Sequence, residues 1–137
     1  MTWKLGLSSD PQKVFSLLTT AEGIMKFWSE KASVKDDIIN FAFPNGQTYR
    51  SKILKATPGK AFHLNYFDSL VKFELEPTVN DGTDLTLVNE GVDEDEFSEV
   101  HAGWVSVLMN LKAVADFQAD LRNHDPQRTW DQGYVDN

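Results

Sequence analysis

The sequence predicts an α+β protein in which a curved antiparallel β-sheet wraps around one long C-terminal α-helix, with two short helices near the N-terminus. Two patterns predict this class. Between about residues 39 and 89, apolar and polar residues alternate in short runs separated by turn residues, as in antiparallel strands. Between about residues 94 and 121, apolar residues recur at spacings of three, four and seven, as on one face of a helix.

The N-terminal part is expected to contain an edge strand and the two short helices. Apolar residues at positions 3, 5 and 7 alternate with other residues, which indicates a short strand. Asp10 and Pro11 indicate a helix start, because Asp can cap free amides and Pro fits the first helical position. Thr20 indicates a second cap, before a helix that carries Phe27 and Trp28 on one side.

About six strands are expected between these helices and the long one. Their apolar positions alternate, and short turns follow each run. The turn signals are Pro44-Asn45-Gly46, Pro58-Gly59, Asp68-Ser69 and Asn80-Asp81-Gly82. Short connections between consecutive strands predict an antiparallel meander with one solvated face.

The C-terminal helix is expected to run from about residue 94 to 121, roughly 40 Å, and therefore to cross the whole molecule. Asp93 and Glu96 have the spacing of a capping box, with Asp in place of the usual Ser or Thr. The polar tail that follows contains Trp130 and Tyr134, which are the residues expected to pack. We place one domain over residues 1–137, with its core at about 3–121 and a polar tail at 122–137.

The net charge and the composition of the chain argue against several classes of partner and site. The chain has 13 Lys and Arg against 21 Asp and Glu, a net charge of −8, which argues against nucleic acid or an anionic membrane surface as partner. It has no cysteine, which excludes disulfides, thiolate nucleophiles and cysteine zinc sites. No apolar run is long enough for a membrane helix, and the N-terminus has no secretory pattern, so a cytoplasmic location is expected.

No pattern in the sequence indicates catalysis, a metal or a cofactor. The histidines, His63, His101 and His124, have no second ligand at metal spacing, and His63 is expected to face solvent. Glu74 and Glu76 alternate with apolar residues, so they are expected on the solvated face of the sheet. There is no nucleophile elbow and no phosphate-binding glycine loop. We therefore expect no catalytic residue, no metal site and no cofactor.

Aromatic residues make up 12% of the chain, and those on inward faces are the candidate ligand site. Tyr49, Tyr66 and Asn89 are the most informative, because a buried hydroxyl or amide without a partner costs about 1–3 kcal/mol. Each needs a protein group, a water or a ligand, and a few polar groups orient ligands in apolar pockets. The alternative is that the rings form an ordinary core. The candidate ligand-binding residues are Trp28, Phe41, Tyr49, Phe62, Tyr66, Phe73, Asn89, Trp104 and Leu108.

Several segments resemble one protein family. They are Asp10-Pro11-x-x-Val14-Phe15, Phe27-Trp28, Gly82-Thr83-x-Leu85-x-Leu87 and Gly103-Trp104-x-x-x-Leu108-x-x-Leu111-Lys112. These segments are similar to the SRPBCC or START-like superfamily, and more narrowly to the branch named after the C-terminal domain of the activator of the heat-shock-protein ATPase. The resemblance covers about residues 3–121, and the tail from Leu121 to Tyr134 resembles bacterial stand-alone members.

The resemblance implies a helix-grip fold with a deep, mostly apolar pocket between sheet and helix. Members of the superfamily bind lipids, sterols, polyketides or other hydrophobic molecules, and some are cyclases or hydrolases. The leading hypothesis is a non-enzymatic protein that binds a small hydrophobic or aromatic molecule in an apolar cavity between the sheet and the C-terminal helix.

Two alternatives remain open. The first is a cyclase- or hydrolase-type enzyme, which needs an inward acid, base or histidine. The second is protein interaction, either as a co-chaperone-like domain or as a homodimer that packs through Trp130 and Tyr134. The true co-chaperones also carry a separate N-terminal domain, for which 137 residues are expected to leave no room, so a chaperone partner is not favoured.

Overall fold

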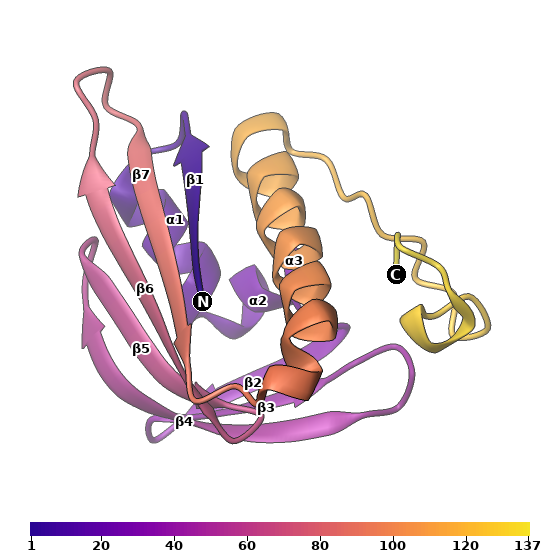
Figure 1. The fold of residues 1–137 in the computed structure, drawn as a ribbon. Helices are drawn as coiled ribbons and strands as arrows, with labels where there is room; N and C mark the ends of the chain where they lie inside the picture. The colour runs from indigo at the N-terminus through magenta and orange to yellow at the C-terminus, as the bar shows by residue number, and fades with distance from the viewer.

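The computed structural model describes residues 1–137 and contains one seven-stranded antiparallel sheet, two short helices and one long helix. The elements in chain order are β1 (Thr2–Leu7), α1 (Pro11–Thr19), α2 (Ala21–Phe27), β2 (Lys31–Lys35), β3 (Ile38–Ala42), β4 (Thr48–Thr57), β5 (Ala61–Tyr66), β6 (Ser69–Pro77), β7 (Thr83–Glu90) and α3 (Phe97–Phe117), with short 3₁₀ turns at Glu94–Glu96 and Trp130–Gln132. The sheet curves around α3, so the predicted helix-grip fold is confirmed (Figure 1).

The strand order is β1-β7-β6-β5-β4-β3-β2, so the first strand closes the meander by pairing with the last. The register between β4 and β5 shifts between Ile53 and Lys55, and such an irregularity bends a sheet. In Figure 1, β2, β3 and β4 pass beneath the start of α3, whereas β1 and β7 stand beside it. The bend therefore allows two parts of one sheet, β2–β4 and β1 with β7, to surround the helix on different sides.

The predicted helix starts at α1 and α2 are confirmed by their caps. The Asp10 carboxylate accepts a hydrogen bond from the Lys13 backbone N–H (2.9 Å), and Pro11 is the first residue of α1. The Thr20 hydroxyl oxygen accepts from the Gly23 backbone N–H (3.0 Å). A Cβ atom added at Gly23 would lie 2.5 Å from the Cα atom of Leu17, so only glycine allows α1 and α2 to approach this closely.

Six of the seven strands lie at the residues predicted for them, and β2 is the one strand that no alternating apolar run predicted. Its sequence offers only Ala32 and Val34 as inward apolar positions, and it lies at the edge of the sheet beyond β3. A two-residue turn at Asp36 and Asp37, both with positive φ (51° and 62°), joins it to β3. Asp tolerates this backbone conformation, which the twist of a tight hairpin requires.

The long helix is shorter than predicted at both ends. Residues 94–96 form a 3₁₀ turn before α3, and the Asp93 side chain makes no capping hydrogen bond, so the predicted capping box is wrong. At the other end, Gln118 adopts the left-handed conformation (φ 52°), and its N–H donates to carbonyls of the last helical turn. None of the helices has the length and apolar character needed to span a membrane.

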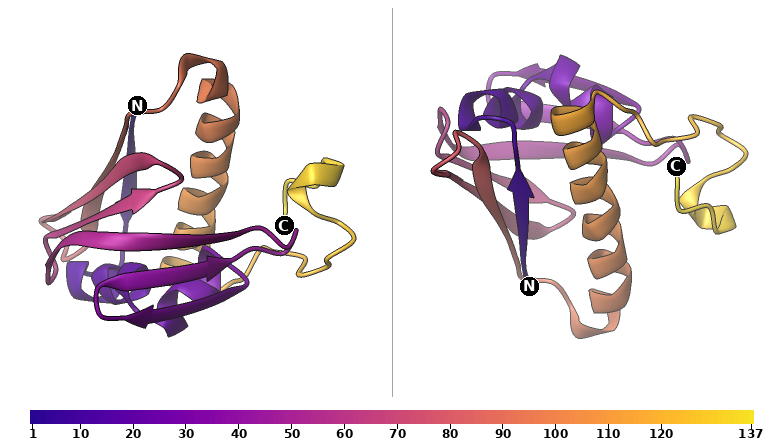
Figure 2. Two further views of the ribbon diagram at one scale, coloured as in Figure 1. Left: turned by 90° about the horizontal axis from the view of Figure 1, so that it is seen from below. Right: turned by 90° about the horizontal axis from the view of Figure 1, so that it is seen from above.

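Arg122, and not the predicted aromatic residues, anchors the C-terminal tail. Its buried guanidinium donates to the carbonyl oxygens of Met25 (2.6 Å) and Ser29 (3.1 Å), beside the end of α2. Trp130 and Tyr134 are exposed, at 37% and 40%, so neither anchors the tail to the core of this chain. Figure 2 shows the tail on the opposite side of α3 from β1.

Candidate functional site

Most of the predicted ligand-binding rings pack against one another in the core. The Trp28 ring centroid lies 4.9 Å from that of Phe41 and 5.7 Å from that of Phe73. Phe62 stacks on Phe73 with 6.2 Å between ring centroids, and Leu108 is buried in the same cluster. These five side chains fill the interior between the sheet and α3, where the resemblance implied a deep apolar pocket.

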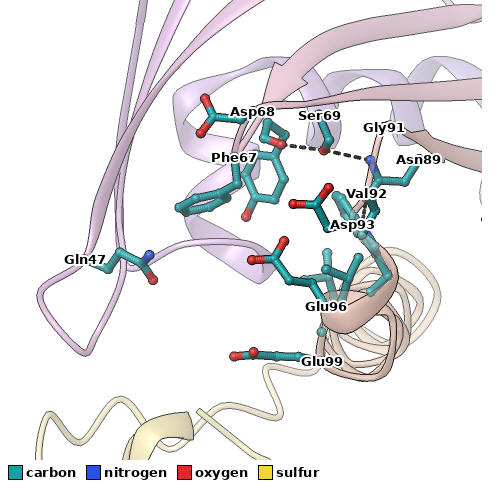
Figure 3. Close-up of a pocket in the computed structure, with 15 residues that line it drawn as sticks. Gln47, Phe67, Asp68, Ser69, Asn89, Gly91, Val92, Asp93, Glu96 and Glu99 are labelled. Carbon is teal, nitrogen blue, oxygen red and sulfur yellow. Dashed lines mark hydrogen bonds between the residues drawn. The ribbon is translucent and has the colours of Figure 1, made fainter.

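A cleft of about 500 Å³ opens at one end of this core (Figure 3). It lies between the β5–β6 turn, the connection from β7 to α3, and the first turns of α3. Its volume is in the range of pockets that hold small molecules. None of the five core residues Trp28, Phe41, Phe62, Phe73 and Leu108 lines it.

A chain of hydrogen bonds fixes one wall of the cleft. The Trp104 indole N–H donates to the Asn89 side-chain oxygen (2.9 Å), and the Asn89 amide donates to the Ser69 hydroxyl (2.8 Å) and the Leu70 carbonyl (3.1 Å). The Ser69 hydroxyl in turn donates to the Tyr66 carbonyl (2.6 Å). Protein groups therefore satisfy the buried Asn89 amide, and the amide holds the Trp104 ring in one orientation.

The Tyr66 side chain forms another part of the cleft lining. Its hydroxyl accepts a hydrogen bond from the Trp28 indole N–H (3.2 Å), but it donates its own proton to no protein group. Burial raises the pKa of this hydroxyl above that of ordinary tyrosine, so it stays protonated in the physiological range. Tyr66 therefore lines the cleft and carries a hydroxyl proton that no protein group accepts.

Phe67 completes the aromatic part of the lining, and Tyr49 supports it from outside. Phe67 has a positive φ of 46°, an uncommon conformation for a bulky residue, in the turn between β5 and β6. Its ring lies 4.6 Å from Tyr49 and 4.8 Å from Tyr66, measured between centroids. Tyr49 itself lines a neighbouring, shallower hollow and not the cleft. The cleft thus brings together Tyr66, Asn89 and Trp104 from the predicted set.

Acidic residues at the cleft are the feature that sequence reasoning missed. Asp93, Glu96 and Glu99 come from the segment that enters α3, and Asp68 comes from the β5–β6 turn. In Figure 3, the first three extend into the open space between Phe67 and α3, whereas Asp68 lies on the far side of Phe67. The signal in the sequence was the acidic run around residue 95, which is also explained by a helix start.

The histidines lie outside the cleft, and each has a protein partner. His63 lies on the face of β5 opposite the buried Phe62 and Leu64, as expected, but its ring is largely covered and lies 2.6 Å from the Glu74 carboxylate. The Trp3 indole N–H donates to His101 (3.0 Å), and His124 bridges Glu30 and Asp120 in the tail. No group of three or more His, Asp or Glu side chains is placed to hold a metal ion.

The sequence of this chain matches one family of known proteins. A family model described as Activator of Hsp90 ATPase homolog 1-like protein matches residues 8–116. A search of curated proteins found no match.

Several solved structures share the fold at low sequence identity. The Aha1 dimer from Colwellia psychrerythraea has a TM-score of 0.74 and 24% identity, covering 85% of this chain and 96% of that one. A protein from Chromobacterium violaceum has a TM-score of 0.71 and 22% identity, with coverages of 85% and 96%. A protein from Staphylococcus saprophyticus has a TM-score of 0.71 and 18% identity, with coverages of 82% and 88%. At these identities the likeness shows the fold alone.

Proposed function

Because the chain belongs to the family of Activator of Hsp90 ATPase homolog 1-like proteins, whose fold suits ligand binding or protein interaction, we propose that it binds one small molecule with an aromatic or apolar body. The ligand lies in the cleft at the start of α3. One observation carries this proposal: the cleft has about 500 Å³ of space beside rings whose positions are already held by protein contacts.

The fixed side chains favour binding because little conformational freedom is lost when the ligand enters. Trp104 is held by Asn89, and Tyr66 is held by contact with Trp28 behind it. The apolar side chains of Val100 and Val107 extend the surface available to the ligand. Preorganised rings of this kind contribute apolar contact at a low entropic cost.

The free donor of Tyr66 sets the orientation of the ligand. A protonated hydroxyl with no protein acceptor offers a hydrogen bond to an oxygen or nitrogen acceptor on the bound molecule. Trp28, Phe41 and Phe73, which lie behind the cleft lining, then act as a rigid support and do not touch the ligand. This assignment replaces the deep pocket of the sequence hypothesis with a cleft at its open end.

A substitution at Gly103 tests the proposal, because Gly103 lines the cleft and a Cβ atom added there meets no atom within 4 Å. We expect Gly103→Leu to fill the cleft, while the matched control Gly103→Ala leaves most of it open. The measurement is native mass spectrometry of protein purified from its own host, with fluorescence titration of 3-ethylindole as a defined probe. A bound molecule that survives equally in both variants would exclude this cleft as its site.

We propose self-association through the outer face of α3 as a second function. Val105 and Met109 lie one turn apart and are 42% and 50% exposed. Between Val100 and Leu111 the helix carries no Asp, Glu, Lys or Arg, in a chain of net charge −8. An uncharged apolar stripe is where two acidic copies can approach without repulsion. The related protein from Colwellia psychrerythraea is described as a dimer.

Light scattering of the purified protein tests this second proposal. We expect a concentration-dependent dimer in the wild-type protein that Met109→Glu disrupts. Val79→Glu is the matched control, because Val79 is 99% exposed and lies outside α3. Disruption by a Trp130→Ala/Tyr134→Ala double variant, with none from Met109→Glu, would place the interface on the tail. If the protein is a monomer at all concentrations, neither the α3 interface nor the tail interface exists.

A further inference from the structure

We infer that the cleft ligand is an organic cation, a molecule whose aromatic or apolar body carries a protonated amine or a quaternary ammonium group. This inference rests on the proposed binding function and adds the charge of the ligand. It follows from two independent features of the cleft: the charges at its mouth and the rings in its lining.

The charges at the mouth are all of one sign. Asp93, Glu96 and Glu99 extend into the open space of the cleft, and Asp68 lies behind Phe67 (Figure 3). Every salt bridge of the protein lies elsewhere, and no Lys, Arg or His lines the cleft. The side chains that line the cleft therefore include four carboxylates and no cation, which favours a negative potential at its mouth.

A helix start does not account for the whole arrangement. The dipole of α3 favours acidic residues near Glu96 and Glu99, but the Asp93 side chain makes no capping hydrogen bond. Asp68 belongs to a different element, the β5–β6 turn, and lies on the far side of Phe67 (Figure 3). These acidic groups also coincide with a cleft of about 500 Å³ that aromatic side chains line, so the feature is a cleft with a charged mouth.

The rings in the lining select the same kind of ligand. Tyr66, Phe67 and Trp104 lie close together, with 4.8 Å between the centroids of Tyr66 and Phe67 and 5.4 Å between those of Tyr66 and Trp104. Aromatic faces attract cations, and tryptophan does so most strongly. An anionic ligand would be repelled by the mouth, and a neutral one would gain nothing from it.

The cation is organic and not a metal ion. No three carboxylate or imidazole groups of the protein are placed to hold a metal. A calcium ion needs six to eight oxygen ligands at short range, whereas the carboxylates of this cleft are spread around its mouth. An organic ammonium group does not require several oxygen ligands at short range, and its apolar body can reach the rings. It therefore fits carboxylates that are spread around the mouth of the cleft.

Three indole compounds of similar size allow the effect of ligand charge on affinity to be measured separately from the effect of the apolar body. Tryptamine is a cation, 3-ethylindole is neutral and indole-3-propionate is an anion. We expect tryptamine to bind about ten-fold more tightly than 3-ethylindole, with indole-3-propionate the weakest, by isothermal titration calorimetry. The difference in affinity between tryptamine and 3-ethylindole should decrease as the sodium chloride concentration rises from about 50 to about 500 mM, because salt screens exposed charges.

Charge-neutral variants locate the effect. We expect Glu96→Gln/Glu99→Gln to weaken tryptamine binding by about ten-fold, since each exposed charge pair contributes a few-fold, and to leave 3-ethylindole unchanged. Glu76→Gln is the matched control, because Glu76 is an exposed carboxylate of β6 outside the cleft. Circular dichroism and thermal melting check that each variant is folded.

The outcomes distinguish this inference from the function on which it rests. If the three indoles bind equally, or if Glu96→Gln/Glu99→Gln weakens tryptamine and 3-ethylindole alike, the ligand charge is wrong and the binding function stands. If Gly103→Leu does not affect tryptamine binding, the cation binds outside the cleft and the inference fails. If no indole binds, both the inference and the proposed binding function are overturned.

Discussion

Asn89 illustrates how a single polar residue organises the candidate site. It is 3% exposed, yet its amide both accepts from Trp104 and donates to Ser69 and Leu70. Its position in the sequence already indicates a special role, because a polar side chain on an apolar strand face needs a partner. The partners proved to be protein groups, so the role of Asn89 is to position Trp104 beside the cleft.

Removing the Asn89 amide should therefore destabilise the fold as well as loosen the cleft. We expect Asn89→Ala to lower the free energy of unfolding by about 3 kcal/mol, because the Trp104 indole N–H and the Leu70 carbonyl lose a buried partner. Urea unfolding measures the change. Asn40→Ala is the control, since Asn40 is exposed on β3, and it should change stability by less than about 0.5 kcal/mol. A loss below about 1 kcal/mol for Asn89→Ala would contradict this role.

At the scale of elements, α3 contributes different surfaces along its length. Trp104, Leu108, Leu111 and Ala115 face the core, and the first turn bounds the cleft with Glu99. The periodicity of apolar residues predicted the buried face correctly from Trp104 to Ala115, whereas Phe97 and Leu121, at the two ends of the predicted stripe, are exposed. It could not predict the ends, because the 3₁₀ turn before α3 and the left-handed Gln118 after it depend on contacts with the rest of the chain.

Two helical glycines provide a matched test of how the helices pack. Gly23 of α2 lies against the backbone of α1, whereas a Cβ atom at Gly103 of α3 meets open space. We expect Gly23→Ala to destabilise the protein by about 1–3 kcal/mol, because α1 and α2 must move apart. Gly103→Ala should instead stabilise it by up to about 1 kcal/mol through helix propensity. Thermal melting measures both, and equal effects of the two substitutions would refute this packing argument.

At the scale of the whole molecule, the tail closes over the end of α2 through a cluster of charges. His124 lies 2.8 Å from Glu30 and 2.7 Å from Asp120, while Arg122 lies 3.0 Å from Asp120. Hydrogen bonds to Glu30 and then to Asp120 raise the pKa of His124 above its ordinary value. Burial opposes ionisation of Asp120, but hydrogen bonds from Arg122 and His124 outweigh it and hold the pKa of Asp120 at about 2.

These shifts predict how pH affects the stability of the tail. A histidine with a raised folded pKa stabilises the fold fully below about pH 6.5 and loses this contribution as pH rises through the folded pKa. Asp120 contributes above about pH 4 and loses its contribution as pH falls toward 2. We therefore expect the stabilisation by His124, relative to a His124→Gln variant, to be largest near pH 5 to 6.

The measurement is the melting temperature of both proteins across pH 4 to 9. The difference between wild type and His124→Gln should fall as pH rises through the raised pKa of His124, because His124 then deprotonates. His101→Gln is the control, because His101 accepts from the Trp3 indole and has no acidic partner. A difference that stays constant from pH 5 to 9 would show that the ion pairs of His124 do not hold the tail.

The amino-acid sequence by itself determined the order of the elements, the antiparallel meander and the inward faces, because period-two and helical patterns are local consequences of which side chains must be buried. Only the tertiary structure decided that Trp28 and its neighbouring rings fill the interior, and that the cleft lies among Tyr66, Trp104 and Glu99. The physical reason is that packing depends on how side chains from distant strands and helices interdigitate. Periodicity identifies which residues point inward, but it does not determine where their shapes leave space.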